Sequence, residues 1–411
     1  MRRFKGLKQL VHDAVDITTD MVEDANESVA AKVMGVLEQI EPLAEPARVV
    51  NQVRRLSARV VYESIHGVND IVSGLGDLGL DAIPTDPASI PSIVPMRSDC
   101  TNQPPWLEDA AIGALNGVVG DYLHDKGNEL DLGMYFRLGD RYVAPQDIEA
   151  PRIALFVHGL SGTEWGWCMN AEAYHGDAAV NFGTLLERDR GYTPVFLRYN
   201  TGRHISHNGR QLADLLDALP CEELVLVGHS TGGLVARSAC YYGEKEQRRW
   251  PGALTHVFCL GSPHLGAPLE KAGNVITSVL GLVDVPGTQI PARIINARSA
   301  GIKDLRFGYL IDEDWEGRDP DALLENTRQD VPLLDGVTYA FIAATLTEHP
   351  DHPLGQLLGD LMVRTKSASG PTTVHESFDV HTDRVSGMLH HEIQNHPDVY
   401  ERMLGVLSTE P

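Results

Sequence analysis

The sequence LVLVGHSTGG, residues 224–233, joins a short apolar run to a turn that is rich in glycine. Consecutive apolar residues of this kind are typical of a strand that is buried on both faces. The turn has the pattern Gly-X-Ser-X-Gly around Ser230, and the residues after it predict a helix. A sharp strand-to-helix turn holds a serine hydroxyl out of the backbone, and glycines two positions away on either side tolerate the crowding. The stretch therefore predicts a nucleophilic serine, the alternative being a structural turn with an incidental Ser230.

A second glycine turn, HGLSG, follows another buried run at residues 152–157 and lies upstream of the serine. In folds with a serine elbow, one N–H that stabilises negative charge comes from the loop after an early strand. The other comes from the residue after the nucleophile. We therefore expect the backbone N–H groups of Leu160 and Thr231 to form an oxyanion hole, the alternative being a simple glycine turn.

Three further stretches extend this pattern: LNGVVGDY at 115–122, RYNTGRHI at 198–205 and GSPHLGAP at 261–268. Together with the two turns, they resemble bacterial α/β-hydrolase esterases and lipases, most closely the branch related to GPI inositol-deacylase-like lipases. The resemblance covers residues 106–408. It implies a mostly parallel sheet with helices on both faces, and a serine carboxylic ester hydrolase that needs no metal or organic cofactor.

The same resemblance implies an acid and then a histidine after the serine. The acid should follow a late strand, which we expect at residues 337–344. Asp360, in the segment GDLMV, matches the acid-bearing segment of related lipases, although that family often has a glycine where Leu361 stands. Asp360 would hold the histidine in the correct tautomer. The competing carboxylates, each read as a solvated loop residue, are Asp335, Asp351, Asp379 and Asp383.

The histidine is expected just before a last helix at residues 397–407, which begins with a proline. In related lipases a histidine precedes a similar Pro-X-Val-Tyr by seven positions, and this spacing selects His390. His391 is an alternative base, and His396 is a further one. The match is imperfect because the family usually has an apolar residue where Gln394 stands.

Other side chains are candidates for the surroundings of the serine. His158 and His264 are expected to orient loops by hydrogen bonding, and His229 directly precedes the serine. Trp165 and Trp167 follow the oxyanion loop and would line the pocket or simply pack in the core. The 17 histidines include several close pairs, but none has the spacing with cysteine or carboxylate that a structural metal site needs. We therefore expect no metal.

The chain of 411 residues is long enough for one large α/β domain and an accessory segment. Its net charge of −23 argues against nucleic-acid binding, because phosphates would be repelled. Five scattered cysteines without a CxxC pair favour thiols over a disulfide scaffold. No apolar leader follows the basic N-terminus and no long apolar stretch occurs, so a cytoplasmic location is expected.

We expect three parts in the chain: a helical segment at 1–83, a proline-rich linker at 84–105 and an α/β-hydrolase catalytic domain at 106–411. Within the last, residues 262–336 separate two expected strands by more than a simple connection needs. This insertion carries helical apolar patterns and predicts a cap or lid over the serine.

The first segment has apolar residues at spacings of three and four from Val11 to Ile40, which indicates a long amphipathic helix. It would pack against the catalytic domain or against a second copy of the chain. Alternatively, basic residues beside Phe4 would place it at a lipid interface. A flexible tail is the remaining alternative, so a homo-oligomer and association with a lipid surface are both open.

The expected substrate is a small-molecule or lipid ester. A serine triad does not separate an esterase or lipase from other acyl-transfer enzymes on the same fold, because the acyl-enzyme is common to both. A thioesterase, lactonase, amidase or acyltransferase is therefore the alternative, and a binding protein with a relic site is a third hypothesis. The shape of the pocket would decide between them.

Overall fold

The computed structural model describes residues 105–125, 131–267, 299–319, 326–345 and 378–408, together with 347, 360, 363, 365–368 and 370. The expected helical segment at 1–83 and nearly all of the linker at 84–105 lie outside these residues. The same is true of the central part of the expected lid, including its helical pattern. These expectations therefore stay predictions.

In the described part of the chain, eight strands form one sheet in the order β2-β1-β4-β3-β5-β6-β7-β8. The six strands from β4 to β8 along this order run parallel, and β1 pairs antiparallel with both β2 and β4 at one edge. The strands are β1 (Met134–Leu138), β2 (Arg141–Val143), β3 (Arg152–Val157), β4 (Thr193–Tyr199), β5 (Glu223–His229), β6 (Leu254–Leu260), β7 (Thr338–Thr345) and β8 (Val380–Ser386).

The central strands are apolar throughout because both faces of the sheet are covered. Along β5, Leu224 and Leu226 belong to one buried cluster, and Val225 and Val227 belong to another. Successive side chains of a strand point to opposite faces, so each cluster is the core on one side of the sheet. Runs of this kind are typical of parallel strands between helical layers.

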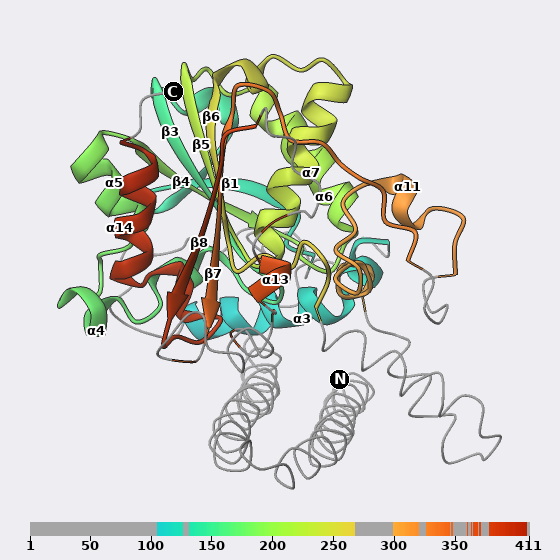
Figure 1. The fold of residues 1–411 in the computed structure, drawn as a ribbon, viewed down its shortest axis with the longest axis horizontal. Helices are drawn as coiled ribbons and strands as arrows, with labels where there is room; N and C mark the ends of the chain where they lie inside the picture. Colours follow the sequence, from blue (N-terminus) through green and yellow to red (C-terminus); the bar gives the residue numbers. More distant parts are fainter. Residues whose placement is uncertain are drawn as a thin grey trace, which may run out of the picture. The chain divides into compact units, whose positions relative to one another are not determined.

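Helices cover both faces of this sheet (Figure 1). α6 (Ile205–Asp217) and α7 (Thr231–Lys245) pack on one face, and α5 (Phe182–Arg190) and α14 (Pro397–Val406) pack on the other. The expected mostly parallel sheet with helices on both faces is confirmed. The remaining helices among the described residues are α3 (Pro105–Asp125), α4 (Ala171–His175), α10 (Ala300–Asp304), α11 (Asp312–Trp315), α13 (Thr365–Ala368) and the short 3₁₀ turns η2 (Pro145–Asp147), η3 (Glu164–Cys168), η4 (Trp250–Ala253) and η5 (Glu392–Gln394).

The sequence does not reveal β8. Its residues VHTDRVS are mostly polar, and only Val385 is buried, because the strand lies at the edge of the sheet. A strand that buries so little has no clear hydrophobic period. β8 matters for the site because it carries the chain back to the carboxyl end of the sheet.

The described helices contain none that is both long and apolar enough to span a membrane.

Candidate active site

Ser230 occupies the turn between β5 and α7 and has φ 54° and ψ −124°. Residues other than glycine rarely adopt this conformation, which costs about 1–3 kcal/mol and is concentrated at functional sites. Two hydrogen bonds hold the turn. The Ser230 N–H donates to the Leu260 carbonyl at 2.8 Å, and the Gly233 N–H donates to the Ser230 carbonyl at 3.1 Å. The serine is thus held in a strained position at the carboxyl end of β5.

The two glycines that flank the serine are required by the close approach of α7 to the sheet. A β-carbon at Gly232 would lie 2.1 Å from the Val157 carbonyl oxygen. A β-carbon at Gly228 would lie 2.4 Å from the Gly233 nitrogen. Because real β-carbons do not approach other atoms so closely, no larger residue fits either position without displacing the backbone.

Asp360 and His390 form a buried pair. The Nδ1 atom of His390 lies 2.6 Å from the Asp360 Oδ2 atom, and the side chains are 7% and 0% exposed. The second carboxylate oxygen of Asp360 accepts a hydrogen bond from the Val363 N–H at 2.8 Å. A β-carbon at Gly261, which follows β6 with φ +62°, would lie 3.3 Å from the His390 ring, so glycine keeps this space open. The chain after β7 and the chain after β8 therefore meet at the carboxyl end of the sheet.

The two alternative histidines lie elsewhere. His391 is exposed and precedes the 3₁₀ turn η5. His396 is the N-cap of α14, where its side chain accepts a hydrogen bond from the Asp398 N–H at 3.2 Å. The structure thus brings His390, and neither of these neighbours, to the Asp360 carboxylate.

The competing carboxylates are also accounted for, apart from Asp351, which lies outside the described residues. Asp335 is exposed. Asp379 accepts a hydrogen bond from the Thr338 hydroxyl at 2.7 Å, and Asp383 forms an ion pair with an arginine of α14 at 2.7 Å. None of these three contacts a histidine of the His390 segment in the described structure.

The loop after β3, which the sequence predicts as an oxyanion loop, lies directly against the serine. A β-carbon at Gly159 would be 3.0 Å from the Ser230 β-carbon. The loop is closed by a turn in which the Gly162 N–H donates to the Gly159 carbonyl at 3.2 Å. Thr231 is the first residue of α7, so its N–H has no partner within the helix. Among the described residues, neither this N–H nor that of Leu160 donates a hydrogen bond to another protein group.

His158 is buried beneath this loop, and its Nδ1 atom lies 3.0 Å from the Gly159 carbonyl oxygen. Burial lowers the pKa of His158 to about 4, so the ring is neutral at physiological pH. Since a carbonyl oxygen only accepts hydrogen bonds, we assign the ring proton to Nδ1. The side chain of His158 is thus hydrogen-bonded to the first peptide of the loop, and its role in orienting the loop stays a prediction.

His229 joins the serine turn to the histidine segment. Its Nε2 atom lies 3.0 Å from the His390 carbonyl oxygen, and the two rings are 5.0 Å apart between centroids. Burial, together with the neighbouring His390, lowers the pKa of His229 well below its usual value. The ring is therefore neutral and donates from Nε2, which fixes the backbone that carries His390.

The remaining pocket candidates are two tryptophans and His264, and the Trp167 ring lies edge-on to the His229 ring, with centroids 6.4 Å apart. Trp167 is fully buried and packs edge-on against Phe156, with ring centroids 5.1 Å apart, so core packing accounts for it. The Arg137 guanidinium lies 4.3 Å from the Trp165 ring centroid. His264 is buried in the loop after β6, and burial lowers its pKa well below the usual value.

A buried charged cluster surrounds Glu164, shortly after the loop that follows β3 in the sequence, and the sequence did not suggest it. Glu164 is fully buried and accepts hydrogen bonds from the Arg198 Nε atom at 3.0 Å and from the Tyr142 hydroxyl at 2.8 Å. The Nε atom of Arg137 lies 3.7 Å away. Burial alone would raise the pKa of Glu164, but the two guanidinium groups and the hydrogen bonds outweigh it and hold the pKa below its usual value. The carboxylate is therefore ionised inside the protein.

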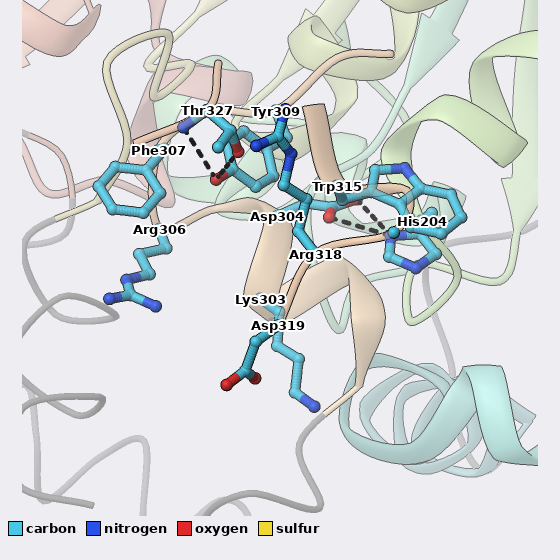
Figure 2. Close-up of a pocket in the computed structure, with 11 residues that line it drawn as sticks. His204, Lys303, Asp304, Arg306, Phe307, Tyr309, Trp315, Arg318, Asp319 and Thr327 are labelled. Carbon is cyan, nitrogen blue, oxygen red and sulfur yellow. Dashed lines mark hydrogen bonds and ion pairs between the residues drawn. The ribbon is translucent and has the colours of Figure 1, made fainter. Parts of the chain in front are cut away.

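A cavity of about 270 Å³ lies away from these residues, beside α10 and α11. The His204 and Trp315 rings at its wall are stacked, with centroids 3.6 Å apart, and both are labelled in Figure 2. Asp304 accepts from His204 there at 3.0 Å. Neither here nor elsewhere in the described part of the chain do three or more histidine, cysteine, aspartate or glutamate side chains gather as metal ligands would.

A model of the alpha/beta hydrolase family matches residues 154–399, more than half of the chain. This chain belongs to the alpha/beta hydrolase family. The match covers Ser230, Asp360 and His390. No curated protein shows significant sequence similarity to this alpha/beta hydrolase.

Several solved structures of bacterial proteins are distantly similar to this alpha/beta hydrolase. The mature lipase BlEst2 of Bacillus licheniformis is 18% identical, with a TM-score of 0.39, over 66% of this chain and 98% of that one. The carboxylesterase CesB from Bacillus subtilis is 12% identical, with a TM-score of 0.36, over 74% and 100%. A lipase-esterase related protein from Clostridium acetobutylicum is 12% identical, with a TM-score of 0.34, over 66% and 99%.

Proposed function

We propose that this alpha/beta hydrolase is a serine carboxylic ester hydrolase in which Ser230 is the nucleophile, His390 the base and Asp360 the acid. The proposal rests on the buried pair of Asp360 and His390, whose Oδ2 and Nδ1 atoms are 2.6 Å apart. Both residues follow strands at the carboxyl end of the sheet, where the strained Ser230 turn also lies. The His229 hydrogen bond to the His390 carbonyl ties these two parts together.

The proton positions support this assignment of roles. An ionised carboxylate only accepts hydrogen bonds, so the proton of a neutral His390 ring resides on Nδ1, facing Asp360. Its Nε2 atom then has a free lone pair. Nε2 is buried and has no hydrogen-bond partner among the described residues. It would take the proton of the Ser230 hydroxyl as that oxygen attacks the ester carbonyl, and then give it to the leaving alcohol.

The negative oxygen of the tetrahedral intermediate needs donors that are already in place. The N–H groups of Thr231 and Leu160 are proposed for this role, since both lie beside the serine and neither is used within the described structure. Fixed donors of this kind stabilise the developing charge without reorganisation, which is usually the largest contribution to catalysis. Water activated by His390 would then hydrolyse the acyl-enzyme.

The proposed substrate is a small-molecule or lipid ester. The sequence resemblance to the GPI inositol-deacylase-like branch favours a lipid ester, and residues 262–336 would form the cap that shapes the acyl pocket. Another acyl acceptor or donor on the same triad, such as a thioester or lactone, is the alternative. It rests on the shared acyl-enzyme chemistry and not on a separate observation.

The first experiment is hydrolysis of p-nitrophenyl esters from acetate to palmitate by the full chain. The wild type should turn over at least part of the series, and Ser230→Ala should reduce kcat by at least about 10⁴-fold while leaving the thermal unfolding midpoint in place. His390→Gln should be equally inactive, and the matched variant His391→Gln should keep activity within about 3-fold of the wild type.

The chain-length profile then separates lipase from esterase behaviour. Wild type inactive on all esters but active on thioesters or lactones would replace the proposed function by the alternative. Full activity in Ser230→Ala would contradict the nucleophile, and loss of activity in His391→Gln alone would move the base to that residue.

A further inference from the structure

The motif RYNTGRHI at 198–205 has no role in the mechanism above, yet its residues hold the oxyanion loop. The Tyr199 hydroxyl donates to the His158 carbonyl at 2.8 Å. The Ser161 N–H donates to the Thr201 hydroxyl oxygen at 3.1 Å. These contacts come from the end of β4, which lies beside β3 in the sheet. The loop is therefore attached to the neighbouring strand on both sides of Leu160.

Because peptides are planar, these attachments set the direction in which the Leu160 N–H points. In a planar trans peptide, the C=O and the N–H point in opposite directions. The Leu160 N–H belongs to the same peptide as the Gly159 carbonyl, which accepts from the Gly162 N–H at 3.2 Å. The peptides before and after it are those held by Tyr199 and Thr201. The direction of the proposed oxyanion donor is thus set by its two neighbouring peptides.

Ser161 is the residue of this loop whose backbone conformation is strained and must be held by its neighbours. Its φ of +58° lies in the left-handed region, which residues other than glycine adopt at a cost. On its other side, a β-carbon at Gly117 of α3 would lie 2.0 Å from the Ser161 hydroxyl oxygen. The strained residue is therefore packed against α3 and hydrogen-bonded to Thr201.

Thr201 is itself firmly placed. It is 1% exposed. The next residue, Gly202, receives a hydrogen bond at its carbonyl from the Gly301 N–H at 2.9 Å, and a β-carbon at Gly301 would lie 2.2 Å from the Thr201 carbonyl oxygen. An acceptor on such a fixed backbone can hold a strained loop in one conformation.

We propose that Thr201 is a positioning residue for the oxyanion hole. Through the Ser161 N–H, its hydroxyl oxygen keeps the Leu160 N–H directed at the site beside Ser230. The inference rests on the proposed function, since it gives Leu160 its role as a donor. In this role Thr201 acts through Ser161 and not on the reacting atoms.

The test compares Thr201→Val, which keeps the shape and removes the acceptor, with Thr201→Ser, which keeps the acceptor. With a short p-nitrophenyl ester, Thr201→Val should lower kcat by about 10- to 100-fold and leave KM within about 2-fold, because a single oxyanion donor contributes about 10²- to 10³-fold. Thr201→Ser should stay within about 3-fold of the wild type in both constants. Inhibition by an aryl boronic acid, which forms a tetrahedral adduct on the serine, should weaken in parallel with kcat.

Thr338→Val is the matched control, because it removes a buried threonine hydroxyl at the amino end of β7 that donates to Asp379 at 2.7 Å. This variant should leave kcat and boronic acid inhibition within about 2-fold of the wild type, whatever its effect on stability. Equal kcat in Thr201→Val and wild type would overturn the proposal. So would equal losses of kcat in Thr201→Val and Thr201→Ser.

A second measurement does not depend on activity. Amide hydrogen exchange in the peptide that contains Leu160 and Ser161 should be faster in Thr201→Val than in Thr201→Ser, because only the first leaves the Ser161 N–H without its acceptor. If the wild type hydrolyses no ester, the proposed function fails, and this comparison still judges whether Thr201 holds the loop. Equal exchange in the two variants would overturn that role as well.

Discussion

The Nε2 atom of His229 lies 3.0 Å from the main-chain carbonyl oxygen of His390. The residue before the proposed nucleophile therefore holds the backbone of the proposed base. We expect His229→Phe, which removes the donor, to lower kcat by about 10- to 100-fold with little change in KM, because small displacements of a catalytic group are costly. Steady-state kinetics on one ester would show this. His256→Phe, at a half-buried position near the amino end of β6, is the control and should retain full activity.

The pairing of Asp360 with His390 makes a prediction about the carboxylates. Asp360→Asn should lower kcat by about 10⁴-fold, since an amide favours the wrong histidine tautomer. Asp383→Asn removes a carboxylate that the sequence also offered, and the structure pairs that residue with Arg402. This second variant should stay within about 2-fold of the wild type. A reversed result would move the acid to Asp383.

The contact between Gly232 and the Val157 carbonyl predicts a large effect of a single methyl group. Gly232→Ala would place a β-carbon 2.1 Å from that oxygen, so α7 must shift. We expect a loss of at least about 2 kcal/mol in the free energy of unfolding, together with loss of activity. At Gly252 nothing lies within 4 Å of a β-carbon, and Gly252→Ala should be within about 0.5 kcal/mol of the wild type. Urea unfolding of both variants checks this, and similar midpoints would contradict it.

Glu164 predicts the cost of removing one member of a buried charged cluster. Glu164→Gln leaves the guanidinium groups of Arg198 and Arg137 without their carboxylate, which should cost about 3–5 kcal/mol of unfolding free energy. The exposed pair of Glu313 and Lys245, 2.8 Å apart, is the comparison, and Glu313→Gln should cost no more than about 1 kcal/mol. Equal losses in the two variants would mean that burial of Glu164 has no energetic consequence.

Three buried neutral histidines predict a loss of stability in acid. Burial lowers the pKa of His158 to about 4, and lowers the pKa values of His229 and His264 well below 6.5. Below pH 6.5 the unfolded chain binds protons at these positions and the folded chain does not. The contribution to stability is therefore complete above this pH and is lost as the pH falls towards 4.

Urea midpoints measured across that pH range should fall, and His264→Asn should show a smaller fall than the wild type. The comparison concerns the slope with pH and not the stability of His264→Asn at neutral pH, because the substitution also changes packing. An identical pH slope in the variant and the wild type would contradict the prediction for His264.

The serine turn could be predicted from the sequence because its signal is local. A strand, two glycines and the start of a helix occur within ten residues. The glycines are needed because larger residues at these positions would clash with the backbone, and this pattern is visible in the sequence. Asp360 and His390 could be proposed only through a resemblance, since nothing in their spacing requires them to meet. The structure brings the two together, and their catalytic roles stay predictions.

Other features depend on contacts between distant segments and were not predicted. β8 is an edge strand with one buried residue, so its sequence has no strong period. Glu164 and Arg198 are 34 residues apart in the sequence, and no local sequence pattern indicates that they form a buried ion pair. The role of Trp167 was left open for a different reason. A tryptophan near a predicted loop is compatible with a pocket or with a core until its neighbours, here Phe156, are known.

The contact between Gly117 and Ser161 has a consequence for how far this protein can be shortened. Residues 154–399 carry the family match, but Gly117 precedes that range and packs against the oxyanion loop. Gly120 packs in the same way against Asn200, where a β-carbon would lie 1.9 Å from the side-chain oxygen. A shortened protein that starts at the family boundary would therefore keep every proposed catalytic residue and lose one wall of its oxyanion loop. We therefore expect the smallest working unit to include α3, which lies upstream of the residues that the family model matches.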